Sequence, residues 1–218
     1  MTNLKGGGPE KFGTIRSFFY QLWAEPSLEP LHRRIAAEIP VARGRLLDVG
    51  CGPGKLDRLL AAPRPGLSVV GVDESEAMIR RAARGPQLPN LEFRQGAVES
   101  LGFREEFDFA LSVLSFHHWE EPEAGLEAVH RALKPGGRFW IYEGDPEAPW
   151  EELRRDQRPL FGWLRLPEGL VRKGLHGHGF TAAEADRVVR PAVARTSFRT
   201  CEISRSGSML RISMVRQP

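Results

Sequence analysis

A glycine-rich segment between positions 48 and 55 carries the strongest chemical signal in the sequence. It reads Asp48-Val49-Gly50-Cys51-Gly52-Pro53-Gly54-Lys55 and follows an apolar run that begins at Leu46. Glycine at every second position lets the backbone turn sharply and approach a ligand closely, because a Cβ atom would occupy the ligand's space. The segment therefore predicts a nucleotide- or nucleoside-binding turn between a strand and a helix.

Three classes of ligand compete for such a turn. A phosphate-binding P-loop needs four residues between its glycines and a hydroxyl residue after Gly-Lys, whereas three residues separate Gly50 from Gly54 and Leu56 follows Lys55. A dinucleotide-binding turn needs Gly or Ala three positions after its second glycine, where Lys55 stands. The spacing excludes the P-loop and disfavours NAD. It remains compatible with S-adenosylmethionine, a nucleoside without phosphate.

A carboxylate at Asp73 ends the second apolar run, Ser68 to Val72. A carboxylate at this point can accept hydrogen bonds from both hydroxyls of a ribose, and we assign that role to Asp73. The alternative, a solvated residue that caps the next helix, suits Glu74 better. Met78, one turn into that helix, is placed to contact an adenine, although such a residue is more often part of the core.

Two histidines follow the fourth apolar run, Phe107 to Val113. They are the ionisable residues of that loop that can exchange a proton near neutral pH. We take His117 as the candidate general base and place His118 beside the methyl acceptor. Adjacent histidines point in different directions, so we expect no metal site here, and the reading in which neither does chemistry stays open. We also expect His176-Gly177-His178 to be a Gly-rich corner rather than a metal site.

Together these segments resemble the class I S-adenosylmethionine-dependent methyltransferases, particularly the group similar to the quinone-biosynthesis enzymes, over residues 45–143. The resemblance implies a methyltransferase with S-adenosylmethionine as its cofactor. Family members commonly carry an acid where Ala97 stands, so backbone groups of residues 96–98 are expected to frame the adenine instead. The full set of predicted cofactor contacts is Asp48, Gly50, Cys51, Gly52, Gly54, Asp73, Glu74, Met78, Gly96, Ala97, Val98 and Val113.

Short apolar runs alternate with helical patterns through the middle of the chain. They predict an α/β fold with a doubly wound, mostly parallel seven-stranded sheet and helices on both faces. Such sheets bind ligands at the carboxyl ends of their strands. The predicted strands are 46–49, 68–72, 91–94, 107–113 and 138–142, the predicted helices are 56–60, 78–83 and 123–133, and a C-terminal antiparallel hairpin is predicted from 197–204 and 209–215.

The remaining segments predict how the chain is divided. Residues 1–40 contain two helical patterns, 12–23 and 27–39, and are predicted to form an N-terminal helical cap in which Tyr20 contacts the acceptor. Residues 41–218 are predicted to form the Rossmann-like cofactor-binding domain, with 145–180 as a substrate-side insertion. After the helix that ends near Leu133, the glycines at 136 and 137 predict a left-handed cap.

Composition narrows the class of partner. The chain has 218 residues, and its 31 basic and 28 acidic residues leave a net charge of +3, too small an excess for a concentrated nucleic-acid-binding face. Two cysteines, no signal-like N-terminus and no membrane-length apolar run indicate a cytoplasmic protein. We predict an enzyme that methylates an O, N or C atom of a small molecule, with neither a membrane nor a nucleic-acid partner; the oligomeric state is left open.

Three other functions remain in competition with this prediction. A tRNA or rRNA methyltransferase is favoured by the high isoelectric point. A non-catalytic cofactor-binding protein is favoured by the missing acid at Ala97. An NAD-dependent oxidoreductase would follow if the glycine turn held a dinucleotide.

Overall fold

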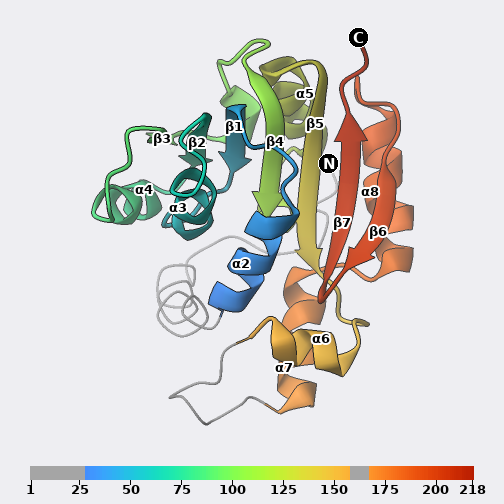
Figure 1. Ribbon diagram of the computed structural model, residues 1–218. Helices are drawn as coiled ribbons and strands as arrows, with labels where there is room; N and C mark the ends of the chain where they lie inside the picture. The colour runs from blue at the N-terminus through green and yellow to red at the C-terminus, as the bar shows by residue number, and fades with distance from the viewer. Residues whose placement is uncertain (1–27, 158–166) are drawn as a thin grey trace.

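The computed structural model describes residues 28–157 and 167–218, which are organised around one seven-stranded sheet (Figure 1). The strand order is β3-β2-β1-β4-β5-β7-β6. Strands β1 to β5 pair in parallel, whereas β7 is antiparallel to β5 and β6 is antiparallel to β7. The strands are β1 (Gly44–Val49), β2 (Leu67–Asp73), β3 (Leu91–Gln95), β4 (Phe107–Val113), β5 (Leu133–Gly144), β6 (Glu202–Ser206) and β7 (Met209–Val215). The predicted fold class is confirmed.

Helices cover both faces of the sheet. They are α2 (Glu29–Glu38), α3 (Lys55–Ala61), α4 (Glu76–Ala83), α5 (Pro122–Ala132), α6 (Trp150–Arg155), α7 (Glu168–His178) and α8 (Ala182–Ala194), with short 3-10 turns η2 (Val98–Ser100) and η3 (Phe116–His118). Side chains of α2 and α3 join one apolar cluster with the sheet, and those of α5 and α8 join the other. Because both faces are buried, the central strands are apolar along most of their length.

Helix α8 lies in a segment for which no helix was predicted. Its start carries a capping box, in which the Thr181 hydroxyl accepts from the Glu184 N–H and the Glu184 carboxylate accepts from the Thr181 N–H. Pro191 inside the helix masks the pattern, since proline normally ends one. The prediction of a strand from Ser197 is also wrong, because Arg199 adopts a left-handed φ of 64° and β6 begins only at Glu202.

The junction between α5 and β5 differs from the predicted left-handed cap. Helix α5 ends at Ala132, and the next residue, Leu133, is already extended, with φ −71° and ψ 148°. Gly136 does have a left-handed φ of 79°, but it lies inside β5, where the register with β4 shifts between Phe107 and Phe109. The left-handed conformation of Gly136 therefore accommodates an irregularity in β5 and does not cap α5.

Between Gly144 and Gly179, the described residues 145–157 and 167–178 lie outside the sheet. The chain departs at Gly144, the end of β5, and comes back at Gly179, which forms an isolated parallel bridge with Gly144. The Phe180 N–H donates to the Gly144 carbonyl at 2.9 Å. Helices α6 and α7 pack on each other beyond the carboxyl end of β5, around the small cluster of Ala148, Leu153 and Val171 (Figure 1).

Three further predictions concern the ends of the chain and this excursion. The predicted helix at 12–23 and Tyr20 lie outside the described residues, whereas the second predicted N-terminal helix is present as α2. His176-Gly177-His178 is the last turn of α7, so the prediction of a Gly-rich corner at these residues is wrong. Among the described residues, no helix has the length and apolar character needed to cross a membrane.

Candidate functional site

The glycine turn joins the carboxyl end of β1 to the start of α3. Gly50, Gly52 and Gly54 have left-handed φ values of 78°, 55° and 73°, which residues with a Cβ rarely adopt. The N–H groups of Gly50 and Cys51 donate to the Val72 carbonyl at 2.8 and 3.1 Å, which fastens the turn to the neighbouring strand β2. Gly54 is the N-cap of α3.

The three glycines differ in what surrounds them. A Cβ on Gly50 would lie 1.9 Å from Ser115 Oγ, and a Cβ on Gly54 would lie 2.2 Å from the Phe93 ring. A Cβ on Gly52 would meet nothing within 4 Å among the described residues. Packing therefore accounts for the first and third glycines, whereas the second leaves open space above the turn. We call this open side of the turn at Gly52 the cradle, because a ligand can approach the bare backbone closely there.

Asp73 ends β2 beside this cradle, and its carboxylate is tied to two backbone segments. Its Oδ2 accepts from the Gly52 N–H at 2.9 Å, and its Oδ1 accepts from the Ser75 N–H at 2.9 Å. Burial raises the pKa of Asp73 above its ordinary value, and the hydrogen bonds from the N–H groups of Ser75 and Gly52 partly oppose that shift. The structure thus brings the acid and the glycine turn into direct contact, as the sequence predicted.

The other predicted cofactor residues lie at or just after the carboxyl ends of β2, β3 and β4. They differ in exposure: Glu74 is exposed, Met78, Gly96, Ala97 and Val113 are half-buried, and Val98 is buried. The Gly96 N–H donates to the Asp73 carbonyl at 3.1 Å, which links the ends of β2 and β3. Val98 packs in the core that faces α5, so it can offer a ligand only its backbone.

Asp48 and Cys51 lie beneath the turn and not on its open side. Asp48 is 2% exposed, on the face of the sheet covered by α3, where it meets the fully buried Asp57. Burial raises the pKa of the Cys51 thiol well above its ordinary value, so this thiol stays protonated and is a poor nucleophile. Asp57 was missed in the sequence, where it looks like an ordinary acid in the first turn of a helix.

His117 is held at the rim by an acid that the sequence reading did not single out. Leu114 adopts a left-handed φ of 53° directly after β4 and turns the chain into η3 across the strand ends. The His117 Nδ1 lies 2.7 Å from Glu143 Oε2, and its backbone N–H donates to Glu143 Oε1 at 3.3 Å. Glu143 is fully buried and the His117 side chain is 6% exposed.

This arrangement assigns different tasks to the two ring nitrogens of His117. A carboxylate can only accept from Nδ1, so Nδ1 carries the proton and Nε2 becomes the basic atom of the ring. The ring of His118 lies 3.9 Å from that of His117 and is exposed. Within residues 28–157 and 167–218, no cluster of three or more His, Cys, Asp or Glu has a geometry that could hold a metal ion.

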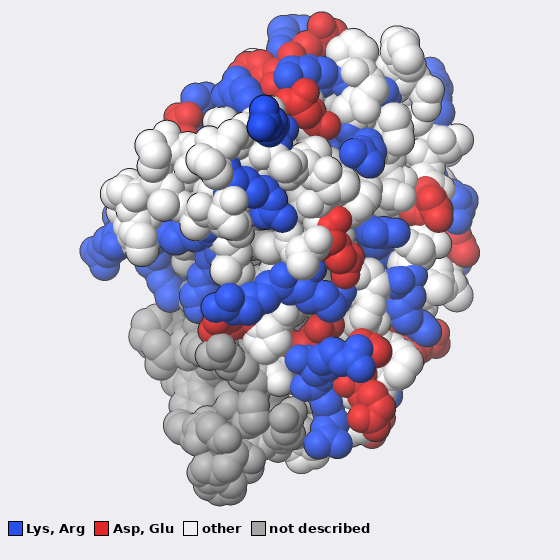
Figure 2. All heavy atoms as spheres, viewed as in Figure 1, with Lys and Arg blue, Asp and Glu red and all other residues white. Residues whose placement is uncertain are grey.

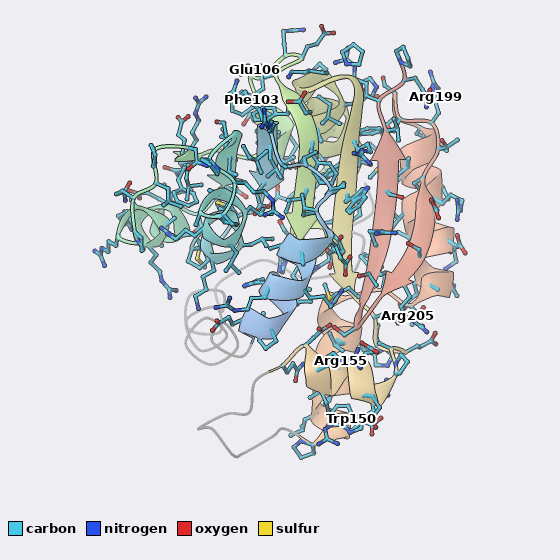
Figure 3. All side chains as sticks on the ribbon, in the orientation of Figure 1. Phe103, Glu106, Trp150, Arg155, Arg199 and Arg205 are labelled. Carbon is cyan, nitrogen blue, oxygen red and sulfur yellow. The ribbon has the colours of Figure 1, made fainter. Side chains whose placement is uncertain are left out.

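An open cleft of about 700 Å³ lies at the same end of the molecule, between α2, α6 and the turn from β6 to β7. Figure 3 shows Arg155 on α6 and Arg205 on β6 at this end. The Arg34 guanidinium binds Asp156 at 2.8 and 2.9 Å and reaches Glu38 at 2.6 Å, while Arg205 binds the buried Asp145. Arg34 and Arg205 therefore pair with acids of the chain. These ion pairs join α2, the α6 region and the β6–β7 hairpin at the cleft.

Comparison with known proteins agrees with this geometry. Residues 47–141 match a family model described as a methyltransferase domain. The chain is 29% identical over 155 residues to a ubiquinone biosynthesis O-methyltransferase of Albidiferax ferrireducens, covering 65% of this chain and 60% of that protein. The chain spans between 33% and 60% of the length of the first five curated relatives that it matches.

Solved structures share the whole fold at low sequence identity. A putative S-adenosylmethionine-dependent methyltransferase from Methanococcus maripaludis superposes with a TM-score of 0.67 at 18% identity, covering 98% of both chains. The plantazolicin methyltransferase BpumL, solved with S-adenosylhomocysteine, superposes with a TM-score of 0.66 at 15% identity, covering 94% of this chain and 89% of that one. At such identities the superpositions establish the fold.

Proposed function

We propose, from the premise that residues 47–141 form a class I S-adenosylmethionine-dependent methyltransferase domain, that the chain transfers a methyl group to a small-molecule acceptor. The observation that carries the proposal is the cradle at Gly52, together with the Asp73 carboxylate that borders it. The cradle leaves room for a ligand against bare backbone, and the carboxylate is an acceptor for ribose hydroxyls.

The residues of this chain fit S-adenosylmethionine. The Gly50–Gly54 turn would lie under its methionine arm, Asp73 would accept from the ribose, and residues 96–98 would border the adenine. When bound, the cofactor supplies an electrophilic methyl group on a positively charged sulfur. The departure at Ala97 removes one side-chain acceptor for the adenine, and backbone groups of the half-buried residues Gly96 and Ala97 are the proposed substitute.

His117 is the residue that we propose to act on the acceptor. A hydroxyl or ammonium group must lose a proton to become a good nucleophile, and Nε2 of His117 takes that proton. Glu143 holds the ring from the Nδ1 side and stabilises the imidazolium that forms, as the carboxylate of a Ser-His-Asp triad does. Because His117 and Glu143 are nearly or fully buried, water has little access to the pair.

A small acceptor, rather than a macromolecule, is our proposal for the substrate. Among the described residues, α2 and the helices α6 and α7 lie beyond the carboxyl ends of the strands (Figure 1), and Trp150 is a half-buried aromatic side chain on α6 (Figure 3). The relative named for O-methylation in ubiquinone biosynthesis supports an oxygen acceptor on a small molecule.

An RNA acceptor is the second candidate, because the surface is rich in arginine. Figure 2 shows basic side chains across the viewed face with acidic ones among them. Many arginines also pair with acids in the structure, as Arg33 does with Glu29 and Arg195 with Glu123. Titration with tRNA at several salt concentrations tests this candidate, since tight binding that falls steeply with salt would place RNA first.

Calorimetry tests the proposed function directly. We expect S-adenosylmethionine and S-adenosylhomocysteine to bind with one site per chain and NAD not to bind. Transfer of labelled methyl groups to a panel of small hydroxylated, aminated and ring-bearing compounds then identifies the acceptor. Binding of NAD without binding of either sulfur nucleoside would contradict the proposal.

Replacing Gly52 by alanine should separate ligand binding from folding. The new methyl group would enter the open space above the turn, so we expect the affinity for S-adenosylhomocysteine to fall at least tenfold, about 1.4 kcal/mol. The left-handed φ at this position adds a destabilisation of about 1–2 kcal/mol.

Gly136→Ala is the matched control for this substitution. Gly136 also has a left-handed φ and an unfilled Cβ position, but it lies at the opposite end of the sheet. Both variants should therefore lose similar stability in thermal unfolding, and only Gly52→Ala should lose affinity. Equal affinities in the two variants would show that the cradle is not the binding site.

A further inference from the structure

The floor of the glycine turn contains two buried carboxyl groups. Asp48 projects from β1 and is 2% exposed, and Asp57 projects from the first turn of α3 and is fully buried. Their carboxyl groups lie close enough for each to shift the pKa of the other. The pair lies within the helix–strand packing directly below the residues that form the cradle.

The chain makes room for this pair. Gly71 is the β2 residue paired with Asp48, and a Cβ on it would lie 2.8 Å from Asp57 Oδ1 and 2.9 Å from Cys51 Sγ. A side chain at position 71 would therefore push Asp57 out of the floor. The absence of a side chain at position 71 is therefore what leaves space for the two carboxyl groups under the turn. This indicates that the buried acids occupy a specific arrangement.

Two carboxyl groups in contact can hydrogen-bond only if one of them carries a proton. Apart from the contact between the two carboxyl groups, no side chain of the described residues donates a hydrogen bond to Asp48 Oδ1 or to either carboxyl oxygen of Asp57. Burial and the neighbouring Asp57 raise the pKa of Asp48 well above its ordinary value. Burial raises the pKa of Asp57 to about 7. Asp48 therefore keeps its proton and donates it to Asp57.

The other ionisable groups around the pair do not change the assignment of the proton to Asp48. Asp73, at the end of β2, and the Cys51 thiol, in the turn, add negative potential or none. Arg58 on α3 favours the charged form of Asp57, but its guanidinium donates to the carbonyls of Gly54 and Pro53. Gly71, which carries no charge, lies against Asp57, and the Phe93 ring packs beside Gly71.

We propose that Asp57 is a positioning residue for the cofactor, which holds Asp48 beneath the glycine turn through a shared proton and places one negative charge under the positively charged methionine arm. This inference rests on the proposed function, since it assumes that S-adenosylmethionine lies on the turn. It assigns a role to a side chain that touches the ligand only through Asp48 and the backbone above it.

The proposal predicts how affinity changes with pH. Below about pH 7 both carboxyl groups are protonated and the floor is neutral, whereas above it Asp57 is charged. A cationic ligand favours the charged floor, so the affinity for S-adenosylmethionine should rise as pH rises from 6 to 8. S-adenosylhomocysteine lacks the sulfonium charge, so its affinity should rise less.

Two variants of Asp57, with Asp186→Asn as control, test the proposal by calorimetry at pH 6 and pH 8. D57N keeps a hydrogen-bonding group beside Asp48 without a charge, and D57A removes both. We expect D57N to match the unmodified protein at pH 6 and to bind S-adenosylmethionine about tenfold more weakly at pH 8. D57A should be weaker at both pH values. Asp186 is an exposed acid on α8, so its variant should follow the unmodified protein.

Comparing variants at equal pH removes the titration of the ligand itself from the result. An equal ratio of affinities at pH 6 and pH 8 for D57N would overturn the inference while leaving the proposed function standing. Failure of the unmodified protein to bind either sulfur nucleoside at any pH would overturn both.

Thermal unfolding without ligand gives a second, independent measurement. A buried carboxyl group whose pKa is raised by folding makes the folded protein less stable as pH rises from the group's unfolded pKa, near 4, towards 7. D57N should therefore have a higher melting temperature relative to the unmodified protein at pH 8 than at pH 5. A difference that is the same at both pH values would show that folding does not raise the pKa of Asp57, and would overturn the inference.

Discussion

Replacing Asp73 by alanine is expected to weaken S-adenosylmethionine binding by about 100-fold or more, with the domain still folded. The carboxylate accepts from the N–H groups of Gly52 and Ser75, and we propose that it also accepts from the ribose. Hydrogen bonds to a charged group contribute about 1.5–3 kcal/mol each, so losing two from the ligand corresponds to at least that fold-change. Calorimetry with S-adenosylmethionine and S-adenosylhomocysteine measures it.

The control for this variant is Glu76→Ala. Glu76 is an exposed acid in the first turn of α4, paired with Arg80, and lies three residues from Asp73. It should bind both nucleosides as the unmodified protein does. Circular dichroism confirms folding of both variants. An Asp73→Ala protein that is folded and binds with unchanged affinity would remove the carboxylate from the cofactor site.

The second large effect is expected at His117. His117→Ala should lower kcat by about 100- to 10,000-fold, the usual contribution of a general base, when the acceptor is a hydroxyl or ammonium group. The affinity for S-adenosylhomocysteine should be unchanged, because the imidazole is proposed to act on the acceptor. Stopped-flow or steady-state methyl transfer, measured beside calorimetry, separates the two quantities.

Glu143→Gln tests the positioning of the same ring. The amide has nearly the shape of the carboxylate but cannot stabilise an imidazolium by charge, so we expect kcat to fall and KM to change little. His130→Ala, on α5 and away from the strand ends, is the control. Normal turnover in His117→Ala would exclude a base at this position, and a loss of turnover limited to Glu143→Gln would assign Glu143 a structural role only.

The order of elements and the main features of the turn are local properties of the chain. Alternating apolar runs and helical patterns predict β1 to β5 because buried parallel strands and amphipathic helices have distinct periodicities. The spacing of Gly50, Gly52 and Gly54 and the acid that ends the next strand are likewise visible in sequence. Since parallel strands bring their carboxyl ends to one edge, these local signals also predict that Asp73 meets the turn, as it does.

Local signals fail where two effects compete within one segment. Helix α8 has a clear capping box at Thr181 and Glu184, but Pro191 disfavours a helix. The packing of Ala185, Val189 and Val193 on the sheet outweighs the effect of the proline. The start of β5 fails in the same way, because glycines after a helix predict a cap wherever they occur, and only pairing with β4 shows that Gly136 belongs to the strand.

By itself, the sequence determined the fold class, the glycine turn and the acid beside it, because each depends on residues close together in the chain. Only the tertiary structure decided which acids act in pairs. Glu143 meets His117 across 26 positions because β4 and β5 are neighbours in the sheet, and Asp57 meets Asp48 because α3 folds back over β1. Side-chain burial and contact depend on sheet order and helix packing, which no local pattern records.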